Sequence, residues 1–179
     1  MRWEERLGDL FDDLEQQAEG LALAERDAEV VKQSRAEYAQ LELAARVHAS
    51  VGRRLLIVVT GVGGLDGTLT RAGSGWLLLD DGRREWIVAT PAVASLRGLS
   101  DRALGPEVRP LTARLGLTSA LREVADARAD AALHHRDGSL TRGTLERVGT
   151  DFVEVRVGED RRSHRLTVPV SALAAVRSL

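Results

Sequence analysis

The 179-residue sequence contains no cysteine, a single lysine (Lys32) and few aromatic residues, which make up 3% of the chain. The lack of cysteine excludes disulfides, thiolate nucleophiles and thiolate metal sites, and it fits a reducing compartment. No apolar run approaches the roughly 20 residues of a membrane-spanning helix. Acidic residues interrupt the N-terminal stretch where a signal peptide would have its apolar core. The sequence therefore predicts a cytoplasmic protein.

Charge is nearly balanced over the whole chain but not along it. The formal net charge is −2, which gives no general attraction to nucleic acid or to a membrane. Residues 1–50 hold twelve acidic and six basic residues, a net charge of −6, which leaves +4 on the remainder. This asymmetry indicates different surfaces for different contacts.

Residues 1–50 are predicted to form an N-terminal helical or coiled-coil segment. Neither proline nor a turn dipeptide interrupts residues 3–49, and apolar residues recur at helical spacing. The pattern is typical of a coiled coil or of a helical hairpin bent at Gly20, and the alternative is one amphipathic helix lying on the rest of the protein. The candidate assembly residues on this stripe are Leu7, Leu10, Leu14, Leu21, Val31 and Tyr38.

From residue 51 onwards the apolar pattern changes to that of short strands. We expect one set of strands in residues 51–100 and another in residues 118–179, separated by a linker at 101–117 that contains Gly105, Pro106 and Pro110. A short helix, capped by Thr118 or Ser119, should open the second set. The predicted strands are 55–60, 65–71, 76–79, 84–89 and from 96, then 131–136, 140–147, 152–157, 164–168 and 176–179.

The two sets of strands are related by an internal repeat. Gly67 and Gly73 match Gly143 and Gly149, and Trp76 matches Phe152, all at an offset of 76 residues. After the following hairpin the offset becomes 80 residues, so that Val88 matches Val168 and Arg97 matches Arg177. A repeat of this length is too long for a solenoid unit and indicates a duplicated small domain.

The repeated residues carry a resemblance to a known family. They are Gly143-Thr144-Leu145, Gly149 to Val153, Val168 to Leu173, and Val176, with weaker echoes in the first copy. This pattern resembles the Sm-like small β-barrels, a family that includes bacterial Hfq and the eukaryotic Sm proteins. The resemblance implies an α+β, mainly β fold: a long N-terminal helical segment followed by two tandem Sm-like or SH3-like five-stranded barrels. Gly67 and Gly143 would permit the sharp bend in the second strand of each barrel.

The best-known activity of that family is the binding of single-stranded RNA in a ring. The resemblance places the corresponding contacts at Thr150-Asp151 and Pro169 to Ser171. The stacking aromatic and the basic residue expected there are missing, and stacking contributes about 1–3 kcal/mol per base at such sites. RNA binding in the family's usual place is therefore not expected.

A different group of basic residues offers a possible contact for nucleic acid on the second barrel. Arginine and histidine side chains can neutralise phosphates. Glu146, Glu159 and Asp160 lie among them in the sequence, so a solvated charged rim is the alternative. The candidate residues are Arg142, Arg147, Arg161, Arg162, His164 and Arg165.

No pattern of an enzyme is present. The four histidines, at 48, 134, 135 and 164, show no convergent metal-ligand spacing, and Gly61 to Gly64 lacks the Lys-Ser/Thr of a phosphate loop. We predict no catalytic, cofactor or metal site. The leading hypothesis is a non-enzymatic binding or scaffold protein that assembles, with a protein partner or with itself, through its N-terminal helix and tandem small barrels. The alternative is a nucleic-acid-associated regulator that uses the basic residues of the second barrel; a membrane is not an expected partner.

Overall fold

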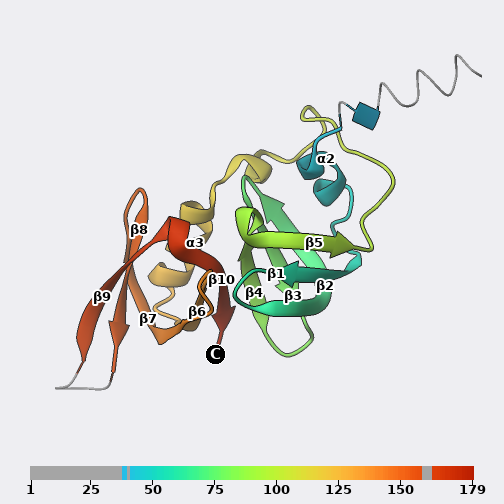
Figure 1. Ribbon diagram of the computed structural model, residues 1–179. Helices are drawn as coiled ribbons and strands as arrows, with labels where there is room; N and C mark the ends of the chain where they lie inside the picture. The colour runs from blue at the N-terminus through green and yellow to red at the C-terminus, as the bar shows by residue number, and fades with distance from the viewer. Residues whose placement is uncertain (1–37, 40, 159–162) are drawn as a thin grey trace, which may run out of the picture. The chain divides into compact units, whose positions relative to one another are not determined.

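The computed structural model describes residues 38–39, 41–158 and 163–179 (Figure 1). Glu42–Leu179 form one compact unit. Its first half contains α2 (Leu43–His48), β1 (Arg54–Val59), β2 (Gly63–Gly73), β3 (Trp76–Asp80), β4 (Glu85–Ala89), η1 (Thr90–Ala92) and β5 (Val93–Arg97). Its second half contains η2 (Leu111–Arg114), α3 (Leu117–Asp126), β6 (Asp130–His135), β7 (Leu140–Val148), β8 (Phe152–Val157), β9 (His164–Pro169), η4 (Val170–Ala172) and β10 (Leu173–Ser178). None of the described helices is long and apolar enough to cross a membrane.

The strands form a single ten-stranded antiparallel sheet in the order β5-β1-β2-β3-β4-β10-β6-β7-β8-β9. The prediction of two tandem barrels is wrong, because one continuous sheet runs through both halves. What joins them is the pairing of β4 with β10, in which Trp86, Ile87 and Val88 lie opposite Arg177, Val176 and Ala175. Apolar periodicity shows which side chains face a core but not which strand edges meet, so this pairing could not be predicted.

The order of strands is nevertheless the same in both halves. The first half reads β5-β1-β2-β3-β4 and the second reads β10-β6-β7-β8-β9, so β10 holds the place of β5 and β9 the place of β4. The 3₁₀ turns η1 and η4 precede the equivalent strands β5 and β10. The internal repeat of the sequence thus corresponds to a repeated strand topology.

Two apolar cores lie on either side of the joined strands. The first core gathers Val47, Leu55, Ile57, Val59, Leu69, Leu77, Leu79, Trp86, Val88, Ala89, Ala92, Ala174 and Ala175. The second gathers Leu121, Ala125, Ala131, Leu133, Leu145, Val153, Val155, Val168, Leu173 and Val176. Strand β10 contributes to both, which explains why its first four residues are all buried. Ile87 of β4 likewise packs against the second core while its neighbours belong to the first.

The second strand of each half is distorted at the same place in the repeat. The register of β2 shifts between Leu69 and Arg71, and that of β7 shifts between Leu145 and Arg147. Such irregularities bend a strand. The glycines just before them allow the next strand to approach closely, since a Cβ on Gly67 would lie 2.7 Å from the carbonyl oxygen of Asp80 and a Cβ on Gly143 would collide with that of Arg156.

The predicted long N-terminal helix is not supported by the described residues. Tyr38 and Ala39 are helical, but Glu42 has extended backbone angles (φ −80, ψ 143), and α2 is only six residues long. Helix therefore does not run unbroken to residue 49, because Glu42 interrupts it before α2 packs Val47 into the first core. The described residues give no support to a coiled coil either, since the helix at Tyr38 and Ala39 does not continue through Glu42. The other candidate assembly residues, Leu7, Leu10, Leu14, Leu21 and Val31, lie outside the described residues.

The segment predicted as a linker is tied to the first half. The Trp76 indole N–H donates a hydrogen bond to the carbonyl oxygen of Leu115 (2.8 Å), and Ser74 forms an isolated bridge with Gly116. Helix α3 then begins at Leu117 without a side-chain cap, where the sequence suggested Thr118 or Ser119. Burial of Leu121 and Ala125 against the second core fixes this helix instead.

Candidate binding surfaces at the seam between the two halves

We call the paired strands β4 and β10, with β3 and β6 beside them, the seam. Successive residues of a strand point to opposite faces of a sheet, and residues directly opposite each other share a face. Glu85, Ile87 and Val176 therefore lie on one face of the seam. Trp86 and Arg177 lie on the other. The two faces differ in charge.

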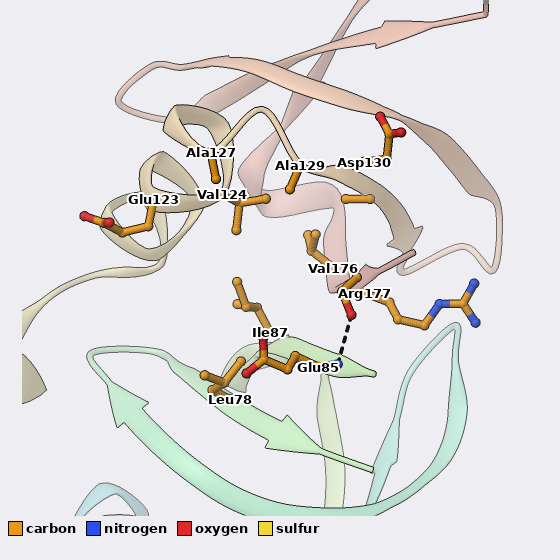
Figure 2. Close-up of a pocket in the computed structure, with 12 residues that line it drawn as sticks. Leu78, Glu85, Ile87, Glu123, Val124, Ala127, Ala129, Asp130, Val176 and Arg177 are labelled. Carbon is orange, nitrogen blue, oxygen red and sulfur yellow. Dashed lines mark hydrogen bonds between the residues drawn. The ribbon is translucent and has the colours of Figure 1, made fainter. Parts of the chain in front are cut away.

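The first face carries a cavity of about 270 Å³ under α3, shown in Figure 2. Leu78 and Ile87 form its floor, Val124 and Ala127 of α3 cover it, and Val176 lies beside them. The backbone N–H of Glu85 donates to the Ser178 hydroxyl (3.0 Å), which holds the two strand ends together (Figure 2). The full lining is Leu78, Glu85, Ile87, Glu123, Val124, Ala127, Ala129, Asp130, Ala131, Val176, Arg177 and Ser178.

Three carboxylates lie at this cavity. Glu85, Glu123 and Asp130 line it, and none of them forms an ion pair within the described part of the chain. Asp130 accepts a hydrogen bond from the Thr144 hydroxyl (2.6 Å). Arg177 also belongs to the lining, so this apolar cavity has residues of both charges around it.

The opposite face of the seam holds a cluster of cations around one tryptophan, which we call the arginine cluster: Arg84, Trp86, His134, Arg142 and Arg177. The Arg177 guanidinium lies 5.3 Å from the centre of the Trp86 ring, and the His134 ring lies 5.2 Å from it. The Trp86 indole N–H donates to Asp81 (2.9 Å).

Burial leaves two nitrogens of this cluster without partners. Nε2 of His134 and Nε of Arg177 are buried and form no hydrogen bond with the described residues. Burial lowers the pKa of Arg177, and the charges of Arg84 and Arg142 lower it further. Burial also lowers the pKa of His134, with Arg177, Arg142 and His135 adding to the effect. The positive charges of the arginines are thus held close together despite their mutual repulsion.

A broader groove lies between α2, β2 and α3. Its volume is about 780 Å³, and it includes His48, Ser119 and Asp126. No hydrogen bond links these three side chains within the part of the chain that the structure describes, so they do not form a catalytic triad. The groove is also lined by Val51, Thr70, Arg71, Ala72, Trp76, Leu104, Pro110, Thr112, Leu115, Ala120, Arg122 and Glu123.

Two of the basic residues proposed from the sequence lie beside glutamates. Arg165 lies 3.3 Å from Glu146 and 3.7 Å from Glu154, and Arg147 lies 4.0 Å from Glu154. His164 is exposed at the start of β9. Arg142 belongs to the arginine cluster instead, and Arg161 and Arg162 lie outside the described residues.

Sequence reasoning missed Arg84, Trp86 and Arg177 as members of a common site. They come from opposite ends of the two repeats and meet only because β4 pairs with β10. Alternation along each strand does place Trp86 and Arg84 on one face, but no residue pattern indicates which strand lies next to them. The sequence therefore indicates which residues of one strand share a face, but it does not indicate which strands are neighbours in the sheet.

The comparisons with known proteins add no family. No family model matches the chain, and a search of curated proteins finds no match. Among the described residues, no group of three histidine, aspartate or glutamate side chains could hold a metal ion.

Two histidines, the buried His48 and the half-buried His134, should make the fold sensitive to mild acid. The pKa of His48 lies below its ordinary value of 6.5 because of burial and then the charge of Arg109, and that of His134 is lowered as described above. Below about pH 6.5 the unfolded chain therefore binds more protons at these sites than the folded chain, and stability falls as the pH decreases. Asp66, Asp81 and Asp137 have lowered pKa values, so their contributions are lost only at a more acid pH, below 3.8.

We expect urea unfolding to show a loss of stability between about pH 7.5 and about pH 5.5. A His134→Gln variant should show a smaller loss over the same interval. The control is His164→Gln, because His164 is exposed on β9. Equal pH dependence in His134→Gln and the unmodified protein would contradict the assignment.

Proposed function

We propose that this protein is a non-enzymatic scaffold whose copies associate through the two edges of the sheet. The observation that supports this most directly is the pairing inside the molecule. Strand β4 of the first half pairs with β10 of the second, while the equivalent strands, β9 and β5, are the two edges of the sheet. Strand β9 therefore lacks the neighbour that β4 has in β10, and β5 lacks the neighbour that β10 has in β4.

Burial agrees with this account. Trp86 is buried in β4, whereas its repeat counterpart Leu166 in β9 is 38% exposed. Strand β10 buries its first four residues, whereas β5, its counterpart, has none that is fully buried. Exposed strand edges offer unpaired backbone groups to another chain. At these positions the side chains are more buried where a neighbouring strand is present than where it is absent.

The repeat also specifies how two copies would pair. Transferring the β4–β10 register by 80 residues places Val168 of one copy opposite Ser95 of the next, Thr167 opposite Leu96 and Leu166 opposite Arg97. An interface between two different surfaces of the same chain is head-to-tail, and it produces rings when the rotation closes. The resemblance to Sm-like proteins, whose best-known activity takes place in a ring, agrees with such an assembly.

A substitution at the edge tests this proposal. Leu166→Asp should convert the assembly to monomers while leaving the circular-dichroism spectrum unchanged, because a charge desolvated between two strands is costly. The measurement is the mass of the full chain by light scattering after size exclusion. The matched control is Leu111→Asp, at an exposed leucine (79%) in η2, away from both edges. A full chain that remains monomeric at every concentration would refute the proposal, as would an assembly unchanged by Leu166→Asp.

The alternative function, a nucleic-acid-associated regulator, receives less support from the residues first proposed for it. Arg147 and Arg165 have glutamates beside them, and these glutamates would compete with phosphates. A binding assay with single-stranded RNA and duplex DNA across a salt titration tests the alternative. Affinity that falls steeply as salt rises would favour it over a scaffold.

A further inference from the structure

The arginine cluster lies on inner strands of the sheet and not on its two edge strands. Its geometry follows from the register of four strands. Trp86 of β4 is opposite Arg177 of β10, which is opposite Ala132 of β6, which is opposite Arg142 of β7. Residues in such a row share one face of the sheet. Because strands lie about 4.8 Å apart, Arg177 and Arg142 are separated by roughly 10 Å at their Cα atoms, across the small side chain of Ala132.

The cations of the cluster have few carboxylates near them. Asp130, two residues before Ala132, shares their face, but it accepts a hydrogen bond from the Thr144 hydroxyl (2.6 Å). Asp81 is the one carboxylate whose charge acts on Arg177 among the described residues. Its oxygens already accept hydrogen bonds from the Trp86 indole (2.9 Å) and from the backbone N–H groups of Arg83 and Arg84 (both 2.8 Å). Within the described residues, Arg84, Arg142 and Arg177 form no ion pair.

The central guanidinium is also held in place before any ligand arrives. Arg177 is partly buried on the Trp86 ring, and its Nε is enclosed without a hydrogen-bond partner. Arg142 and Arg84, by contrast, are exposed and can close on a ligand. A partly buried central cation with two exposed ones beside it is suited to a compact anion with several acceptor oxygens.

We propose that the arginine cluster is a binding site for a phosphate group, held by Arg177, Arg142 and Arg84. Phosphate matches the site because guanidinium groups bind its oxygens in pairs and its negative charge offsets the repulsion among the three arginines. Trp86 is buried beneath Arg177 and His134, so it offers no free ring on which a base could stack. The ligand is therefore recognised by its phosphate, whether free or in a nucleic-acid backbone.

Calorimetric titration of the full chain with inorganic phosphate, at constant ionic strength, tests the site. Saturable binding is expected, and Arg142→Gln or Arg84→Gln should each weaken it by about tenfold, as the loss of one charged hydrogen bond implies. Both side chains are exposed, so neither change should unfold the protein. The matched control is Arg53→Gln, which removes the same charge from an exposed residue before β1. It should leave the affinity unchanged.

A second titration identifies the source of the phosphate. A single-stranded oligonucleotide that displaces inorganic phosphate, and fails to bind Arg142→Gln, would assign the site to a nucleic-acid backbone. Phosphate binding that the oligonucleotide does not affect would assign it to a small phosphorylated ligand. Absence of saturable binding would overturn the proposal. So would equal weakening by Arg53→Gln and Arg142→Gln, which would indicate an adventitious ion only.

Discussion

Replacing Leu121 with alanine should lower the free energy of unfolding by about 4 kcal/mol, near the upper end for a buried leucine. Leu121 is 0% exposed and belongs to the second core, where α3 packs against β7. The change removes apolar contacts and leaves a cavity. The surrounding strands cannot move in to fill it, because β6 and β10, which contribute to the same core, are paired with each other in the seam. Urea unfolding of the variant, with the midpoint and slope fitted together, measures the loss.

The control for this prediction is Leu111→Ala. Leu111 is 79% exposed in η2, so its truncation should change stability by less than about 0.5 kcal/mol. Equal effects of the two substitutions would mean that α3 is not anchored through Leu121. An unchanged unfolding midpoint for Leu121→Ala would lead to the same conclusion.

The second large effect is expected at Gly143. A Cβ at this position would collide with the carbonyl oxygen of Arg156 on the adjacent strand and would press on the Val155 side chain (2.9 Å). Backbone atoms of a paired strand cannot move aside without breaking the ladder, so Gly143→Ala should cost about 3 kcal/mol, as overpacking of a well-packed interior does. The measurement is again the free energy of unfolding in urea.

Gly64 provides the matched control, because it is also a strand glycine and a Cβ there would meet nothing within 4 Å. Gly64→Ala should therefore leave stability within about 0.5 kcal/mol of the unmodified protein. If Gly143→Ala were tolerated as well as Gly64→Ala, the approach of β8 to β7 would not depend on the missing side chain.

Local features of the chain could be predicted because short-range chemistry determines them. The Asp81-Gly82 and Asp137-Gly138 hairpins are confirmed: Gly82 and Gly138 both have φ of 87°, a conformation that glycine adopts without strain. The predicted strands also lie close to β1–β4 and β6–β9, which are short runs rich in apolar residues between turns. Turn residues and alternation act over a few positions, so a single sequence is enough to recognise them.

Features that depend on contacts between distant strands could not be predicted. Ile87 and Val176 are ordinary apolar strand residues, and nothing in their sequence context indicates that they lie opposite each other. The candidate site has the same origin, since Arg177 reaches Trp86 only through this pairing. The rim that the sequence did suggest was proposed from charge alone. Its acidic neighbours Glu146 and Glu154 proved to lie beside its arginines.

The sharing of β10 between both cores has a consequence for how the protein is made. Strand β4 leaves the ribosome long before β10, and until then the first core lacks Ala174 and Ala175. Domains that fold during synthesis generally do so from the N-terminal side. Strand edges that are still unpaired at that stage are prone to aggregation. One edge of β4 can pair with β3 at once, but its other edge must stay open until the whole second half has been translated. A chaperone that shields this edge would raise the yield of native protein.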